Sequence, residues 1–181
     1  MTLQTGRLNI REIFLADIDN IHKLHSLSET DKFNTLGVPD TIQTTEEIVT
    51  GWLGGQNEHP RTTYVFCLEH IDTKQFIGLI AFNLGKPKFK IAEVWYKIHV
   101  DNWQKGYTIE ALTELLNFGF CELKLHRIEA GCAVENIASG KVLEKVGMTK
   151  EGMKRKILPI RGEWIDSYIY AILDEDFKTR K

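Results

Sequence analysis

The chain has 181 residues, of which 43% are hydrophobic and 27% charged, and a formal net charge of −2. These values predict one folded domain over residues 1–181 and exclude a disordered chain. A net charge this close to zero produces no basic field that would attract nucleic acid. The sequence also contains no apolar run of the ~18–20 residues that a membrane helix needs. Three unpaired cysteines and an N-terminus without an apolar leader predict a reducing, cytoplasmic compartment.

Apolar periodicity divides the first half of the chain into strands and helices. The predicted elements are a strand at 7–13, a helix at 17–27, a helix from about 44 to 53 ended by Gly54-Gly55, and strands at 62–69, 76–83 and 90–100. His22 and His25 are three apart on the first helix, a spacing that suits a metal. Since no third ligand is near, we expect an amphipathic helix and no metal.

The second half alternates helices and strands. It comprises a helix at 106–122, a strand at 126–134, a helix at 137–146 closed by Gly147, and strands at 149–157 and 163–173. Strands that alternate with helices in the centre of a chain predict a mixed sheet with helices packed on it. The chain lacks the glycine-rich dinucleotide and Walker-type phosphate motifs, the G-x-S-x-G elbow and C-x-x-C.

Two segments carry patterns that suit a ligand. In Val100–Ala111 a strand ends, Lys105 and Gly106 form a polar turn, and a helix begins. The first N–H groups of a helix have no internal partner, so this turn suits either a pyrophosphate or a plain tight connection. In Glu135–Met148, Asn136 is placed as a helix N-cap and Ser139 falls in the first turn.

Together these segments resemble the GCN5-related N-acetyltransferase (GNAT) superfamily. The resemblance lies in Trp103–Ala111, followed about 25 residues later by Asn136–Ser139 and Leu143–Met148. Arg7-Leu8, Gly78, Ala92–Val94 and Gly162–Asp166 extend it over nearly the whole chain. More narrowly, the chain is similar to the branch of ribosomal-protein N-terminal alanine or serine acetyltransferases.

The resemblance implies a GNAT fold of the α+β or α/β class. Its core would be a twisted, mixed and mostly antiparallel sheet of about seven strands, flanked by about four helices. It also implies acetyl-coenzyme A (acetyl-CoA) as cofactor and a primary amine as acceptor. The implied cofactor contacts are Ile98, His99, Val100, Gln104, Lys105, Gly106, Tyr107, Thr108, Asn136 and Ser139, the first three through a β-bulge in strand 90–100.

Two residues depart from the superfamily signature Q/R-x-x-G-x-G/A. Trp103 stands where Gln or Arg is usual, although tryptophan is frequent there in this branch. Thr108 stands where Gly or Ala is usual, so it either crowds the pyrophosphate or donates a hydrogen bond to it. This departure bears on cofactor affinity more than on function.

Acetylation of an amine needs a proton acceptor for the amine and a hydrogen-bond donor for the leaving thiolate. Alternation places Glu93, Trp95 and Lys97 on one face of strand 90–100. A carboxylate beside a bulky aromatic side chain is partly shielded from water, so Glu93 is the expected base, directly or through water. The alternative is a solvent-facing strand on which Glu93 pairs with Lys97; Glu110 and Glu114 are expected on the exposed side of their helix.

Ser139 is the expected leaving-group stabiliser. Many relatives use a tyrosine in this helix, but Leu143 occupies that position here, and in the ribosomal-protein branch a serine takes the role. The structural alternative is an ordinary first-turn serine. Tyr168 and Tyr170 are candidates for the substrate wall, although core packing is the preferred role for each.

The acceptor stays open at this stage. A peptide N-terminus, a small-molecule amine such as a polyamine, amino sugar or amino acid, and a cofactor-binding regulatory module without turnover all fit the motifs. We expect no nucleic-acid or membrane partner, and a monomer or homodimer. The acceptor site should lie between residues 15–56 and the hairpin at 155–164.

Overall fold

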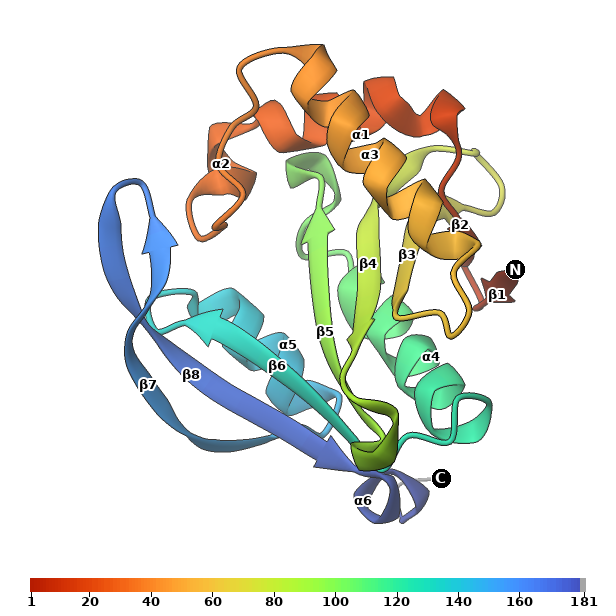
Figure 1. Cartoon of the computed structure of the whole chain (residues 1–181), viewed down its shortest axis with the longest axis vertical. Coiled ribbons are helices and arrows are strands. Elements are labelled where there is room, and N and C mark those ends of the chain that lie inside the picture. Colours follow the sequence, from red (N-terminus) through yellow and green to blue (C-terminus); the bar gives the residue numbers. More distant parts are fainter. Residues whose placement is uncertain (180–181) are drawn as a thin grey trace.

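A single twisted sheet runs through the computed structural model, which describes residues 1–179 (Figure 1). Its strand order is β1-β2-β3-β4-β5-β6-β8-β7, and only the β5–β6 pair is parallel. The strands are β1 (Thr2–Gln4), β2 (Leu8–Glu12), β3 (Thr63–His70), β4 (Phe76–Leu84), β5 (Ile91–Ile98), β6 (Arg127–Ala133), β7 (Thr149–Ile160) and β8 (Glu163–Leu173). The predicted mixed, mostly antiparallel sheet is confirmed. Its extra strand is β1, which is too short to show alternation.

Helices cover both faces of this sheet. They are α1 (Ile18–Ser26), α2 (Ser28–Asp31), α3 (Ile42–Gln56), α4 (Tyr107–Cys121), α5 (Ile137–Lys145) and α6 (Asp174–Lys178). Figure 1 shows α1 and α3 across one face and α4 and α5 on the other. The two helices beyond the expected four, α2 and α6, have only four and five residues.

The second predicted helix is longer at both ends than its sequence signals indicated. Thr41 caps α3, because its Oγ1 accepts a hydrogen bond from the Thr44 N–H at 3.4 Å. The helix then continues through Gly54 and Gly55, although glycine costs roughly 1 kcal/mol in a helix interior. Gly55 is buried against β3, where a Cβ added to it would lie 3.9 Å from the Cβ of Thr63. Tertiary packing therefore outweighs the local stop signal.

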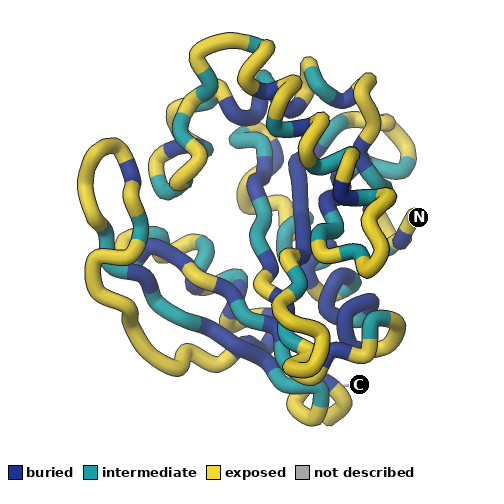
Figure 2. Tube along the Cα trace, in the orientation of Figure 1, coloured by how far each residue is buried: buried dark blue, intermediate teal, exposed yellow. Residues whose placement is uncertain are grey.

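The sheet separates two hydrophobic cores. The larger core packs β2–β6 and β8 against α4 and α5, with Phe66, Phe82, Leu112 and Ile128 at its centre. The smaller core packs the other face of β3–β5 against α1 and α3, through residues such as Val49 and Leu79. Figure 2 shows the central strands buried along most of their length. Strand β5 is therefore covered on both faces rather than exposed on one.

The sheet splits between its two parallel strands. Strand β5 pairs with β6 only at Ile91–Arg127, Ala92–Ile128 and Glu93–Glu129, and the two strands then diverge (Figure 1). On its other side, β5 stays paired with β4 from Leu84–Ala92 to Gly78–Ile98. The candidate site lies along this split, where residues of β5 and β6 line a cavity.

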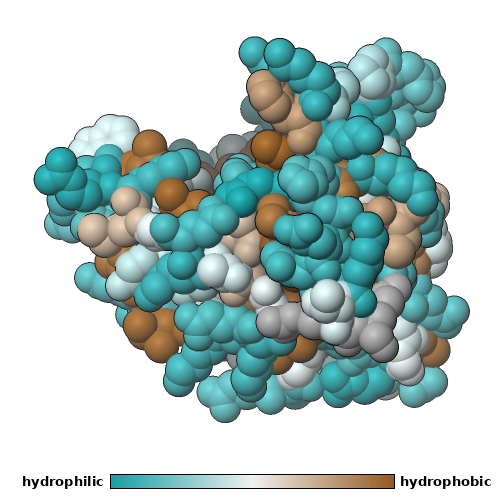
Figure 3. Space-filling view, turned by 90° about the horizontal axis from the view of Figure 1, so that it is seen from below, coloured by the Kyte–Doolittle hydropathy of each residue, from teal (hydrophilic) through white to brown (hydrophobic). Residues whose placement is uncertain are grey.

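The outer surface is mainly polar. Figure 3 shows hydrophobic side chains scattered among hydrophilic ones on the face seen from below. Among residues 1–179, no helix combines the length and the apolarity that crossing a membrane requires. The edge strand β7 is exposed at every position from Thr149 to Ile157.

Candidate active site

The split leaves backbone groups of β5 free on one side. The bonds from His99 N–H to the Ile77 carbonyl (2.9 Å) and from Gly85 N–H to the Ile91 carbonyl (2.8 Å) show that odd-numbered residues bond to β4. Because antiparallel strands alternate in this respect, the backbone groups of Tyr96 and Ile98 point into the split. The Ile98 carbonyl there accepts a hydrogen bond from the Trp103 indole N–H at 2.8 Å.

The bulge expected near Ile98–Val100 is absent. In the part of the chain that the structure describes, the β4–β5 ladder reaches Ile98 without a shift of register. Divergence of β6, rather than a bulge, frees the backbone of Ile98. The amide of His99 is held by Ile77, and the carbonyl of Val100 accepts from Trp103 N–H at 3.1 Å, so these groups face the sheet and the following turn.

A turn at the N-terminus of α4 presents unpaired amides. Gln104 and Gly106 both have left-handed backbones, with φ of 60° and 81°. The first intrahelical bond runs from Glu110 N–H to the Gly106 carbonyl at 3.1 Å, so the amides of Tyr107 and Thr108 have no helical partner. Amides at a helix start attract anions, so this turn fits a pyrophosphate.

The N-terminal segment holds that turn in place. Arg7 donates to the Lys105 carbonyl at 3.1 Å and forms an ion pair with Glu110 at 2.6 Å, while its guanidinium lies 4.6 Å from the centre of the Tyr107 ring. Burial acts to raise the pKa of Glu110, but hydrogen bonds from Thr5 and Arg7 outweigh it and lower the pKa. Glu110 is thus half-buried and paired, and its expected place on the exposed side of the helix was wrong.

A cavity of about 500 Å³ extends from this turn along the split. Of the ten predicted cofactor contacts, five line it: Ile98, Gln104, Thr108, Asn136 and Ser139. The other five surround it without lining it; the ammonium of Lys105, for example, donates to Asn102 at 3.5 Å, and Tyr107 packs under Arg7. The residues present fit a long ligand with an anionic end at the turn.

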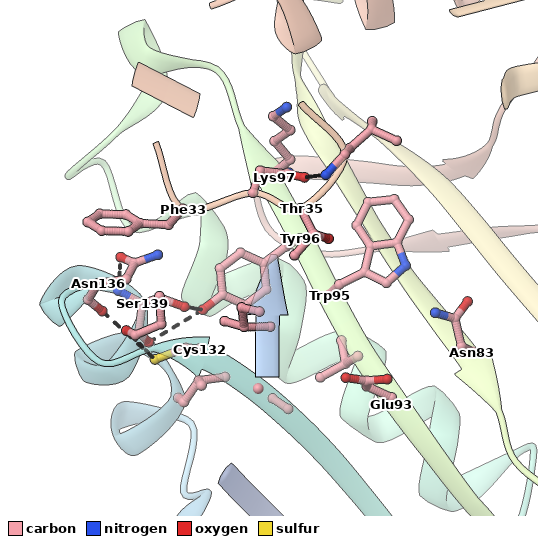
Figure 4. Close-up of a pocket in the computed structure, with 18 of the residues that line it drawn as sticks. Phe33, Thr35, Asn83, Glu93, Trp95, Tyr96, Lys97, Cys132, Asn136 and Ser139 are labelled. Carbon is pink, nitrogen blue, oxygen red and sulfur yellow. Dashed lines mark hydrogen bonds between the residues drawn. The ribbon is translucent and has the colours of Figure 1, made fainter. Parts of the chain in front are cut away.

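The first turn of α5 meets β5 through two hydroxyl groups. Asn136 caps α5 as predicted, because its Oδ1 accepts from the Ser139 N–H at 3.2 Å. The Ser139 Oγ lies 2.7 Å from the Tyr96 hydroxyl, a contact that Figure 4 shows at the centre of the site. Burial raises the pKa of Tyr96, although the bond to Ser139 lowers it in part, so Tyr96 stays protonated.

Tyr96 was missed as a site residue. Alternation assigns it to the apolar face of β5, and it does pack against the larger core. The available signal was chemical, because a tyrosine within a buried apolar stripe needs a partner for its hydroxyl. Nothing local identifies Ser139, 43 residues later, as that partner.

A second cavity of about 450 Å³ adjoins the first and opens on the α1–α3 side. The two cavities share Phe33, Asn34, Tyr96, Lys97, Asn136 and Ser139. Glu93 lines the second cavity and is exposed, with Trp95 and Asn83 near it (Figure 4). Among the described residues that line this cavity, Glu93 is the one carboxylate.

Lys97 does not pair with Glu93, contrary to the alternative for this strand. Only 5% of Lys97 is exposed, and its side chain extends away from the Tyr96–Ser139 pair (Figure 4). Its ammonium has no hydrogen-bond partner among the described residues. The odd-numbered face of β5 is exposed at Glu93 but buried at Lys97, near His25 of α1 and Asp31 of α2, which sequence alternation did not reveal.

The remaining candidates have structural partners. Tyr170 is buried and donates to Glu144 at 3.4 Å, while Tyr168 lies under the ammonium of Lys150 at 4.2 Å, so both pack as the structural alternative predicted. His22 bonds Thr45 at 2.8 Å, and His25 packs edge-on against Trp52.

Comparison with known proteins agrees with this architecture. Residues 7–149 match the model of the acetyltransferase (GNAT) domain. An uncharacterized N-acetyltransferase of Bacillus subtilis, YnaD, is 35% identical over 98% of this chain and 99% of its own. The [ribosomal protein uS5]-alanine N-acetyltransferase of Escherichia coli is 33% identical over 70% of this chain and 69% of its own. The crystal structure of a GNAT-family acetyltransferase from Bacillus anthracis, 33% identical, covers 97% of this chain and 99% of its own, with a TM-score of 0.84.

The split sheet with an amide-lined turn beside it agrees with an acyl-transferring enzyme, the class that the family match shows. The chain belongs to the GNAT acetyltransferase family. It is an N-acetyltransferase, and its cofactor is acetyl-CoA. Its acceptor is an amine.

Proposed function

We propose that this enzyme acetylates the N-terminal amine of a protein. The observation that carries the proposal is the charge of the second cavity, which is lined by one carboxylate, Glu93, and by a buried lysine, Lys97. A polyamine needs several carboxylates to replace its water, whereas a peptide N-terminus brings one amine on an otherwise uncharged backbone. The relative that acts on ribosomal protein uS5 supports the same acceptor class.

The larger cavity holds the cofactor. The amides of Gln104, Lys105, Gly106, Tyr107 and Thr108 would bind the pyrophosphate, and the amide of Ile98 together with Asn136 would contact the chain that leads to the sulfur. Bound acetyl-CoA supplies an acetyl group activated as a thioester. The free carbonyl and amide of Tyr96 lie at the sulfur end, because β6 has diverged there.

Ser139 would donate a hydrogen bond to the departing sulfur. When the amine nitrogen bonds to the acetyl carbon and displaces the sulfur, the electron pair of the broken bond would stay on sulfur, where this hydrogen bond stabilises the thiolate. The two hydroxyls lie 2.7 Å apart, and with Tyr96 as the donor the serine proton would be free to point at the sulfur. A chain of two hydroxyls also polarises the outer one, so Tyr96 is a positioning residue for Ser139.

Glu93 takes the proton of the amine through water. It lies three residues from Tyr96 on β5, which at ~3.3 Å per residue is roughly 10 Å along the strand. This separation rules out direct transfer near Ser139, and the exposed end of the cavity supplies the water. The proton released by the amine then passes to the carboxylate as the bond to carbon forms.

A panel of acceptors tests the proposal. Thiol release from acetyl-CoA is measured with alanine- and serine-initiated peptides, spermidine, an amino sugar and a free amino acid. We expect kcat/KM for the peptides to exceed that for every small amine by at least about tenfold. A preferred polyamine or amino sugar contradicts the proposal. Binding of CoA without turnover on any acceptor identifies a regulatory module instead.

A further inference from the structure

Unpaired polar atoms gather beside the second cavity. In residues 1–179, four buried side-chain nitrogens or oxygens have no hydrogen-bond partner, and three of them belong to His25, Asp31 and Lys97. His25 and Lys97 both line the cavity. Lys97 acts electrostatically on His25, and Asp31 acts on Lys97, so the three groups lie close together. They come from α1, α2 and β5, which converge at one end of the cavity.

These orphaned atoms are costly to the folded chain. A buried polar group without a partner costs about 1–3 kcal/mol, and more when it is charged. Burial lowers the pKa of Lys97 to about 8, so near pH 7 it is still mainly an ammonium with three unused donors. Burial also lowers the pKa of His25 to about 4, which keeps its ring neutral.

Asp31 does not neutralise Lys97 by direct contact. One of its oxygens accepts from Arg161 at 3.2 Å, in the turn between β7 and β8, and its other oxygen is unpaired. Arg161 also donates to the Ser28 carbonyl at 3.0 Å, so the hairpin and α2 hold each other. Asp31 is therefore bound to the β7–β8 turn, and the ammonium of Lys97 keeps no hydrogen-bond partner among residues 1–179.

The chemistry of Lys97 selects what lies next to it. A cationic amine is repelled by a buried ammonium, whereas a carbonyl or carboxylate oxygen satisfies its donors. The reacting amine has to reach the Tyr96–Ser139 end of the shared cavity. Tyr96, Ser139 and Lys97 line both cavities, so an acceptor whose amine reaches the Tyr96–Ser139 pair also extends past Lys97.

We propose that Lys97 binds a carbonyl or carboxylate oxygen one or two bonds from the amine that is acetylated, and thereby selects the acceptor. This inference rests on the proposed function, because a peptide N-terminus carries such a carbonyl one carbon from its amine. Spermidine carries no oxygen and is rejected. Lys97 is thus a specificity-determining residue on the acceptor side, separate from Glu93 and Ser139.

Two acceptors and two variants test the inference. The acceptors are an alanine-initiated peptide and its alkene isostere, in which the first carbonyl is replaced without a change of charge. The variants are Lys97→Met and, as a matched control, Lys23→Met, which removes an exposed lysine of α1. Wild type and Lys23→Met should prefer the peptide over the isostere by ~10- to 100-fold in kcat/KM, the worth of one charge-assisted hydrogen bond.

In Lys97→Met this preference should disappear, chiefly through a higher KM for the peptide with little change in kcat, because the bond forms before reaction. Activity on the isostere should fall less than activity on the peptide. An equal loss on both acceptors means that Lys97 only supports α2, and it overturns the inference. If Lys97→Met does not fold, the wild-type preference decides alone: equal rates on peptide and isostere overturn the inference.

The same variants separate this inference from the proposed function. If wild type acetylates no peptide, the proposed function fails. Lys97 is then tested on alaninamide against 2-aminobutane, which lacks the carbonyl oxygen. If wild type prefers alaninamide and Lys97→Met loses this preference, the carbonyl-binding role of Lys97 stands. If wild type acetylates both amines equally well, that role is rejected.

Discussion

The two halves of the site are built in different ways. The cofactor half depends on backbone conformation within two short segments, 98–108 and 136–139, each a strand end leading into a helix start. The acceptor half is assembled from side chains of α1, α2, β5 and the β7–β8 hairpin, and its contact between Asp31 and Arg161 joins residues 130 apart. A local motif can encode the first half but not the second.

The halves also differ in how well their polar groups are satisfied. On the cofactor side, Arg7, Trp103 and Glu110 all have partners within the chain. On the acceptor side, the Nδ1 of His25 and the Nζ of Lys97 are buried with no hydrogen-bond partner among residues 1–179. A rigid cofactor half beside an unsatisfied acceptor half suits an enzyme whose cofactor is fixed and whose acceptor supplies the missing partners.

We expect the largest effect from a substitution at Glu93, at the solvent-exposed end of the acceptor half. Glu93→Gln should lower kcat/KM by ~100-fold and flatten its acidic limb, because the proton acceptor is lost. Glu114→Gln, on α4, serves as control. If Glu93→Gln keeps the acidic limb of the pH–rate profile and near-normal rates, Glu93 is not the proton acceptor and is an ordinary surface residue.

Next in size is the stability cost of the unsatisfied lysine. The pKa of Lys97 is lowered from 10.5 to about 8, so the unfolded chain binds the proton more tightly than the folded chain. Below pH 8 the buried charge therefore destabilises the fold, and the penalty fades as pH rises from 8 to 10.5. Lys97→Met should raise the free energy of unfolding by about 2–3 kcal/mol at pH 7.

Denaturant unfolding at pH 7 and pH 10 measures this effect, with Lys23→Met as control. The gain should shrink at pH 10. If Lys97→Met is instead less stable than wild type at pH 7, the ammonium of Lys97 has hydrogen-bond partners in solution. The two halves of the site then do not differ in how well their polar groups are satisfied.

Ser139→Ala tests the junction of the halves. Its kcat should fall by ~10- to 100-fold with little change in the KM for acetyl-CoA, because the hydrogen bond to sulfur strengthens only as charge develops. Tyr96→Phe should cost less. The double variant should be no slower than Ser139→Ala, since Tyr96 acts through the serine. Additive losses would give Tyr96 an independent role.

Gly106→Ala probes the backbone design of the cofactor half and has a matched control. Gly106 and Gly162 share a φ of 81°, so alanine strains both, by roughly 1 kcal/mol. A Cβ at Gly106 would lie 3.4 Å from the Arg7 guanidinium, whereas none of the described atoms lies within 4 Å at Gly162. Calorimetry should show up to ~10-fold weaker CoA binding for Gly106→Ala alone. Equal CoA affinities of wild type and Gly106→Ala would show that the turn at the N-terminus of α4 is not part of the cofactor site.

Sequence predicted best what short-range chemistry determines. The sheet, the order of its strands along the chain and the Asn136 cap follow from alternation, periodicity and capping, which act over a few residues. The turn at Lys105-Gly106 was found for the same reason. The end of α3 was misplaced because packing of Gly55 on β3 overrides a local stop signal.

Long-range partners escaped prediction. The Tyr96–Ser139 and Arg7–Glu110 contacts join residues 43 and 103 apart, and Lys97 is buried near His25 of α1 and Asp31 of α2. Alternation indicates two faces of a strand without saying which is covered. The split between β5 and β6 is likewise a tertiary feature, and it replaced the expected bulge.

The exposed edge strand β7 has a consequence for how copies of this chain behave toward one another. A long outer strand with free amides and carbonyls is a template for pairing with another chain. Along β7, Lys150, Lys154, Arg155 and Lys156 stand among the exposed apolar side chains of Met153 and Ile157. Their like charges repel an identical edge, so these basic residues guard the enzyme against aggregation through its own sheet.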